Sequence, residues 1–315
     1  MEDYPRTVQE FEDRFATEEA CRDYVARLRW PDGFRCPRCG QRAVWRTGRG
    51  LFRCKTCDHK ASITAGTIFQ DSHLPLRTWF GAMWWVTSQK PGASALSLQR
   101  ILGLGSYRTA WALLAKLRRA MIRPGRDRLS GRVEIDETYV GGKDKALYGR
   151  KTEKKALVVI AAEEDGAGTG RIRLRRVVSA SKVNLHRFIL DAVQPGSIVH
   201  TDGWPSYGGL EAKGYGHDVT EMKSAEQGVD MLPRVHRVAS LLKRWLLGTH
   251  QGAVSKAHLD TYLDEFAFRF NRRTSRHRGK LFYRLVQHAV ALPPVPYRRM
   301  VRHARGRRPN TQDMG

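Results

Sequence analysis

The spacing of apolar residues divides the chain into a helical part and a part made mostly of strands. Between residues 68 and 123 apolar side chains recur at helical spacing, and the stretch 94–123 is interrupted at Gly103-Leu104-Gly105-Ser106. A short helix, a glycine turn and a longer helix form a helix-turn-helix pattern. From the pattern alone, a helical hairpin that enters no DNA groove fits equally well. We interpret the aromatic side chains here as core rather than base-stacking residues: Trp79, Trp84, Trp85 and Trp111.

The second part begins near residue 131 with short runs rich in β-branched residues. Strands are predicted in the segments 131–142, 155–166, 170–181 and 196–203. A helix is predicted at 183–193, so the order of elements indicates an α/β layer. Asp136 and Asp202 are each expected at the end of an apolar strand. Two carboxylates carried in this way can share a divalent ion.

The charge of the chain is strongly one-sided. It has 315 residues, with 56 Lys and Arg against 31 Asp and Glu, a net charge of +25 and a pI near 10.4. Such an excess indicates a polyanionic partner, and we expect DNA. No apolar run approaches the ~18 residues that span a bilayer, and the acidic opening MEDYPRTVQEFEDRF is unlike a signal peptide. We therefore expect no membrane partner and a cytoplasmic, nucleoid-associated protein.

Five cysteines in a reducing compartment point to metal binding rather than to disulfides. Two C-x2-C pairs, CPRCG and CKTCD, match the spacing of a zinc ribbon with tetrahedral thiolate coordination. The expected structural Zn²⁺ ligands are Cys36, Cys39, Cys54 and Cys57. Cys21 is interpreted as a small buried residue of the leading helix. The basic ribbon is expected to contact DNA phosphates or only to support its neighbours.

Several of these segments together resemble a known family. The zinc ribbon, VEIDETYVGGK, VHTDGWPSYGGL and the helical stretch that begins HRVASLLKRW are similar to a bacterial insertion-sequence transposase of the zinc-ribbon, ISXO-type group. The resemblance covers about residues 15–290 and implies an RNase H-like catalytic domain of the DDE-like superfamily. It also implies two divalent ions, Mg²⁺ or Mn²⁺, with Asp136 bridging both and Asp202 binding one. Strand alternation places Glu134 beside Asp136 and Glu137 on the opposite face, and neither glutamate is expected to be essential.

The third catalytic residue departs from the family pattern. Resembling enzymes carry an acid on the first long helix after the sheet, with a basic residue seven positions later. Here that helix has His236 followed by Lys243, and the rival is Glu265 in the next helix. Imidazole suits Mn²⁺ better than Mg²⁺, and Lys243 is expected to hold DNA phosphate or to lie on a solvated helix face.

The expected organisation has four parts. They are an N-terminal helix and zinc ribbon at 1–66, a helix-turn-helix-like region at 67–128, the catalytic domain at 129–290 and a basic tail at 291–315, expected to be flexible. The predicted function is a transposase that binds insertion-sequence ends and catalyses DNA cleavage and strand transfer, as a homo-oligomer on DNA. The alternative is a non-catalytic zinc-ribbon and helix-turn-helix DNA-binding protein whose RNase H-like domain has decayed.

Overall fold

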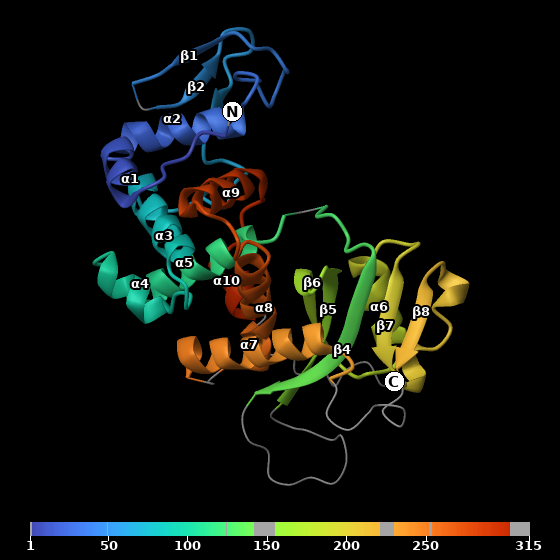
Figure 1. Ribbon diagram of the computed structural model, residues 1–315. Coiled ribbons are helices and arrows are strands. Elements are labelled where there is room, and N and C mark those ends of the chain that lie inside the picture. The colour runs from blue at the N-terminus through green and yellow to red at the C-terminus, as the bar shows by residue number, and fades with distance from the viewer. Residues whose placement is uncertain are drawn as a thin grey trace, which may run out of the picture. The chain divides into compact units, whose positions relative to one another are not determined.

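The computed structural model of this chain describes residues 2–48, 50–123, 125–141, 155–220, 230–251 and 254–302 (Figure 1). The chain forms two compact units. One contains Met1–Arg123 together with Ser275–Arg302, and the other contains Pro124–Thr274. The expected catalytic domain extended to residue 290, whereas the unit that contains the large sheet ends at Thr274.

The second unit is built on a five-stranded mixed sheet. Its strands are β4 (Arg132–Gly141), β5 (Lys155–Asp165), β6 (Gly168–Val177), β7 (Ile198–Asp202) and β8 (Gly216–Thr220). Their order across the sheet is β6-β5-β4-β7-β8 (Figure 1). The first three strands are antiparallel neighbours, whereas β7 pairs parallel with both β4 and β8. The predicted α/β layer is therefore present, with β4 at its centre.

Helices cover both faces of this sheet because its central strands are apolar on both sides. On one face, α6 (Lys182–Ala192) buries Leu185 and Phe188 against Val133 of β4. On the other, α7 (Pro233–His250) and α8 (Lys256–Phe270) pack over the strands. Short 3₁₀ turns, η1 (Pro205–Tyr207) and η2 (Glu211–Lys213), follow β7.

The first unit is helical around an aromatic core. Its helices are α1 (Val8–Arg14), α2 (Glu18–Arg29), α3 (Leu76–Ser88), α4 (Ala95–Ile101), α5 (Tyr107–Ala120), α9 (Arg278–Ala291) and α10 (Tyr297–Arg302). Phe282 of α9 is fully buried, and its ring lies 5.6 Å from that of Phe15 and 5.4 Å from that of Phe80. A segment from late in the chain therefore completes the core of the N-terminal unit.

The predicted pair of helices is found at α4 and α5. Ser94 begins α4 with a capping box, in which its hydroxyl accepts from the Ser97 N–H and the Ser97 hydroxyl accepts from the Ser94 N–H. The turn before α5 uses Gly103 at φ +60°, a left-handed conformation that suits glycine. The segment expected to be a flexible basic tail is helical at α10, where Tyr297 accepts a hydrogen bond from Arg108 of α5. Tail residues 303–315 lie outside the described ranges.

The cysteine-rich segment forms a three-stranded antiparallel sheet. Its strands are β1 (Val44–Arg46), β2 (Phe52–Cys54) and β3 (Lys60–Ala61). Trp30, at the end of α2, packs its ring 4.8 Å from that of Phe52. The small sheet is thus joined to α2 through an aromatic contact as well as through the chain.

Candidate active site and zinc site

Asp136 and Asp202 lie on neighbouring strands at the centre of the large sheet. The parallel pairing of β4 with β7 matches Arg132 with Ile198 and Glu134 with His200. The pairing ends there, and Asp136 and Asp202 each lie two residues further along their own strand. The two carboxylates are close enough for the charge of Asp202 to raise the pKa of Asp136.

One detail of the expectation for Asp136 is wrong. The sequence predicted that Asp136 ends its strand, but β4 continues to Gly141. The reason is that residues Glu137 to Gly141 go on pairing with β5 after the pairing with β7 has stopped. Asp202 does end β7.

Electrostatics make this pair of carboxylates suited to a cation. Burial raises the pKa of Asp136, and the charge of Asp202 raises it further, while the main-chain N–H of Glu137 and His236 act in the opposite direction. Two neighbouring anions in a partly buried position repel each other unless a proton or a cation lies between them. Carboxylate oxygens are the donors that hard divalent cations prefer, so the residues present fit such an ion.

His236 lies next to this pair. It occupies the first turn of α7, and its Nε2 is 3.5 Å from Oδ2 of Asp136. Its Nδ1 is 2.6 Å from Oδ1 of Asp230. A carboxylate on one ring nitrogen orients an imidazole so that the other nitrogen faces a metal or a second carboxylate. Sequence reasoning missed Asp230, although its spacing of six residues from His236 is short.

The other two candidate residues are placed differently. Lys243 is exposed on α7, two helical turns after His236. Glu265 is fully buried in α8, and its Oε1 accepts hydrogen bonds from Nε and Nη2 of Arg269 at 2.9 and 2.7 Å. Of the two rivals for the third position, His236 is the one that contacts Asp136 among the described residues.

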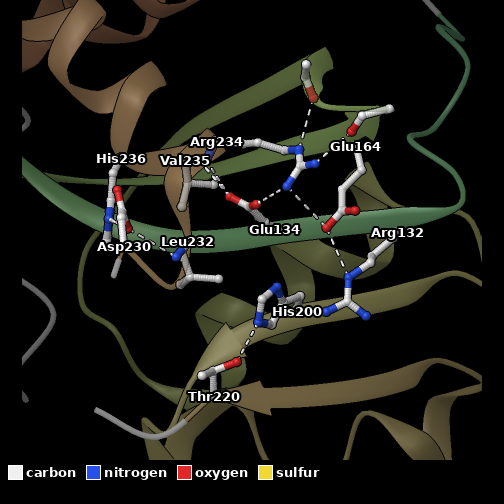
Figure 2. A network of polar contacts seen from close by, with 12 residues as sticks. Arg132, Glu134, Glu164, His200, Thr220, Asp230, Leu232, Arg234, Val235 and His236 are labelled. Atoms are coloured by element: carbon white, nitrogen blue, oxygen red, sulfur yellow. Dashed lines mark hydrogen bonds and ion pairs between the residues drawn. The ribbon is translucent and has the colours of Figure 1, made fainter. Parts of the chain in front are cut away.

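Figure 2 shows a polar network that the sequence did not predict, formed around Glu134, which precedes Asp136 by two residues on β4. Glu134, Glu164 and His200 offer ligand atoms that all lie within 4.8 Å of one another. However, Glu134 and Glu164 already face guanidinium groups, since Arg234 Nη1 is 2.8 Å from Glu134 and Arg132 Nε is 3.0 Å from Glu164. We therefore interpret this cluster as a network of ion pairs rather than as a cation site.

Glu137 projects from the opposite face of β4, as strand alternation predicted. Its carboxylate accepts a hydrogen bond of 2.7 Å from the hydroxyl of Tyr207, which is buried in the core under α6. That acceptor and the surrounding burial raise the pKa of Tyr207 well above its ordinary value, with burial the larger cause. Glu137 therefore has a partner on the far side of the sheet from Asp136.

The four expected zinc ligands come together in the ribbon. Sγ of Cys36 lies 3.6 Å from Sγ of Cys57, and Sγ of Cys39 lies 3.5 Å from Sγ of Cys54. All four sulfur atoms lie within 4.8 Å of one another. A tetrahedron with Zn–S bonds of about 2.3 Å has S–S edges of about 3.8 Å, so the cluster fits one Zn²⁺.

The two cysteine pairs sit in matching turns. The N–H of Gly40 donates to the Cys36 carbonyl, and the N–H of Asp58 donates to the Cys54 carbonyl. Gly40 and Asp58 both have positive φ, +75° and +60°. The main-chain N–H of Cys57 is the largest influence that lowers the pKa of Cys54, whereas hydrogen bonds with the neighbouring thiols raise the pKa of Cys39.

Within the described residues, no helix combines the length and apolar character needed to cross a membrane.

Comparison with known proteins identifies two segments of the chain. Residues 128–271 match the ISXO2-like transposase domain, and residues 16–60 match the transposase zinc-ribbon domain. An uncharacterised protein in transposable element ISH50 of Halobacterium salinarum is 30% identical over 288 residues, which cover 84% of this chain and 94% of that protein. With the mixed sheet and the four-cysteine ribbon, these matches confirm the expected α/β transposase domain preceded by a zinc ribbon.

Solved structures with some similarity are also transposase complexes. A pre-cleavage Mos1 transpososome has 11% sequence identity and a TM-score of 0.28, with 71% of this chain and 78% of that chain covered. The Mos1 strand transfer complex has 13% identity and a TM-score of 0.25, with 73% and 79% covered.

Proposed function

The chain belongs to the IS1595 family of ISXO2-like transposases, and on this premise we propose that it binds the ends of an insertion sequence and cuts and joins DNA there. The observation that carries the proposal is the proximity of Asp202 to Asp136, whose pKa it raises, with Nε2 of His236 in α7 3.5 Å from Oδ2 of Asp136. Transposition in this form needs no protein nucleophile, because water and then a 3′-hydroxyl attack phosphorus.

The proposed reaction centre consists of three side chains with distinct roles. Asp136 and Asp202 would hold the divalent cations. The ions supply activation of the attacking oxygen and stabilisation of the leaving oxygen in an in-line displacement. His236 would contribute a nitrogen ligand, with Asp230 hydrogen-bonded to its other ring nitrogen. An imidazole in this position favours Mn²⁺ over Mg²⁺.

The proposed DNA contacts lie outside this centre. Exposed Lys243 holds a phosphate, and the zinc ribbon and the α4–α5 pair bind the end of the element. Arg100, Tyr107 and Arg108 are exposed around the turn between α4 and α5, where a recognition helix would begin. Joining of two ends requires two active sites, so a homo-oligomer on DNA and association with the nucleoid belong to the same proposal.

The test compares wild type with Asp136→Asn and Asp202→Asn in a donor-plasmid excision assay with Mg²⁺ or Mn²⁺. Each substitution keeps the shape of the side chain and removes the charge that holds cations, so we expect excision to be lost while end binding remains. The matched control is Glu137→Gln, one position from Asp136 on the opposite face of β4. Excision by Asp136→Asn at the wild-type rate would contradict the proposed centre.

One observation favours the alternative function. The family pattern has an acidic residue at the position where this chain has His236. The loss of a catalytic acid is what a decayed catalytic domain would show. A chain that binds ends but excises nothing, in either metal and with both aspartates intact, would be a DNA-binding protein and not an active transposase.

A further inference from the structure

Glu134 is a fully buried carboxylate, two residues before Asp136 on the same face of β4. Its Oε2 accepts hydrogen bonds from the main-chain N–H groups of Arg234 and Val235, at 2.8 and 3.0 Å. Its Oε1 accepts a third bond, of 2.8 Å, from Nη1 of Arg234 (Figure 2). Both oxygens are thus committed to the beginning of α7.

The beginning of α7 lacks a cap of its own. Its N-cap residue is Leu232, which makes no side-chain hydrogen bond to the first turn, and Pro233 follows. The first N–H groups of a helix have no partner within the helix and carry partial positive charge. Glu134, 100 residues earlier in the chain, supplies the missing acceptor and the complementary charge.

The same turn is tied to the sheet at a second place. The guanidinium of Arg234 donates from Nε to the Gly168 carbonyl and from Nη2 to the Gly166 carbonyl, both at 2.9 Å. Gly166 lies in the turn between β5 and β6, and Gly168 is the first residue of β6. The first turn of α7 is therefore held both to β4 and to the β5–β6 turn.

His236 follows Val235 directly, and its Nε2 faces Asp136 at 3.5 Å. We propose that Glu134 is a positioning residue, which fixes α7 against β4 so that His236 and Asp136 together bind a divalent cation. The inference rests on the function proposed above, because it takes His236 as a ligand. It replaces the expectation from the sequence that Glu134 is dispensable.

The test measures Mn²⁺ binding to the full-length, zinc-loaded protein by electron paramagnetic resonance. We expect Glu134→Gln to weaken binding about 10- to 100-fold, as the loss of outer-shell partners does at other metal sites. Without metal, the amides of Arg234 and Val235 should exchange hydrogen faster than in wild type. Hydrogen exchange reports the position of α7 independently of activity.

The matched control is Glu163→Gln. Glu163 is also buried and also accepts from two main-chain N–H groups, those of Ser130 and Arg171, and from the Arg171 guanidinium. It lies on β5 opposite Val133, whose side chain faces α6, so it cannot hold α7 in the same way. Glu163→Gln should lower the melting temperature as Glu134→Gln does, with no change in Mn²⁺ affinity.

A double-mutant cycle separates positioning from a general loss of structure. In a His236→Ala background, Glu134→Gln should have no further effect on Mn²⁺ affinity, because its action passes through His236. An equal effect in both backgrounds, or no loss of affinity in His236→Ala alone, overturns the proposal. If Glu134→Gln does not fold, Glu134→Asp keeps the charge but withdraws the carboxylate from α7, and a smaller loss with the same dependence on His236 is expected.

The outcome for Asp136→Asn tells the two proposals apart. If that substitution leaves Mn²⁺ affinity unchanged, the metal centre itself is absent and the proposed function fails. If it abolishes binding while Glu134→Gln behaves like Glu163→Gln, the metal centre stands and only the positioning role is lost.

Discussion

At the scale of single residues, the fold places the carboxylate of Asp136 in a partly buried position beside a second carboxylate, where a negative charge is unfavourable. Burial and Asp202 both raise its pKa, so the ionised form is unfavourable until a cation is bound. The sequence predicted Asp136 and Asp202 from their apolar strands and from the family resemblance, and it predicted the opposite orientation of Glu137 because strand alternation is a local rule. It could not predict Glu134 or Asp230, whose partners depend on where α7 is placed.

The choice between His236 and Glu265 gives a residue-scale prediction. His236 is half exposed, so His236→Ala should reduce excision strongly with little change in melting temperature. Glu265 is fully buried and paired with Arg269. Glu265→Gln therefore leaves the charge of Arg269 with a weaker partner and should lower the free energy of unfolding by about 3 kcal/mol or more. Excision rate per folded molecule and thermal melting, measured on both variants, decide the matter. A larger loss of rate per folded molecule in Glu265→Gln would make Glu265 the third catalytic residue.

Asp264 provides a prediction of pH dependence. Burial, with a smaller effect from Asp260, raises its pKa from 3.8 to about 7, and Arg126 opposes this rise. A raised pKa means that the folded protein binds the proton more tightly than the unfolded chain does. The contribution to stability is therefore present below pH 4 and is lost as pH rises to about 7, by at most about 4 kcal/mol.

Asp264→Asn removes this ionisation. We expect the variant to melt several degrees above wild type at pH 8 and to lose that advantage by pH 4 to 5. Asp191→Asn is the control, because Asp191 is exposed and paired with Arg175 at the surface. Equal pH profiles for Asp264→Asn and wild type would show that Asp264 is already ionised in the folded protein at neutral pH.

At the scale of elements, the sequence shows which helices are capped by a neighbouring residue, but it does not show which are capped by a residue far away in the chain. Thr7, Thr17 and Ser94 cap the helices that follow them in the chain, and such caps can be recognised in a sequence. In contrast, α3 begins after Pro75 without a side-chain cap, and Glu18 accepts from the N–H groups of Leu76 and Arg77. Like Glu134 at α7, this acceptor comes from far away in the chain, so only the folded arrangement identifies it.

The zinc ribbon is the element that the sequence predicts most completely, because its ligands follow from spacing alone. We expect one Zn²⁺ per chain, and Cys54→Ser should lose it and unfold the ribbon, since the metal supplies much of the stability of so small a sheet. The large-sheet unit should stay folded. Elemental analysis and end binding measure the two consequences. Cys21→Ser is the control: Cys21 is buried near Phe15, away from the four sulfur atoms, and its replacement should keep the metal.

At the scale of the whole molecule, the chain does not divide where its sequence suggested. Helix α9 can complete a core that begins over 260 residues earlier in the chain only through long-range packing. Its Phe282 contacts aromatic rings of α1, α3 and the α1–α2 connection. A fragment of residues 1–125 therefore lacks part of its own core, and tests of end recognition need the full chain.

A mutation in the core of one unit should accordingly unfold that unit and leave the other folded. Phe282→Ala removes the centre of the first core and should cost about 3–5 kcal/mol there, with loss of end binding and retention of Mn²⁺ binding that depends on Asp136. Phe266→Ala, in the core under α7 and α8, should abolish Mn²⁺ binding and leave end binding intact. Both variants remove the same side chain from a buried site, so each is the control for the other. If both variants lose both properties together, the units do not fold independently, and recognition of ends and binding of metal cannot be assigned to separate parts of the chain.

The affinity of the wild-type protein for element ends should also fall as the salt concentration rises, because end binding is expected to rest on phosphates. In a plot of log affinity against log salt concentration, the expected slope is about −0.9 for each neutralised phosphate.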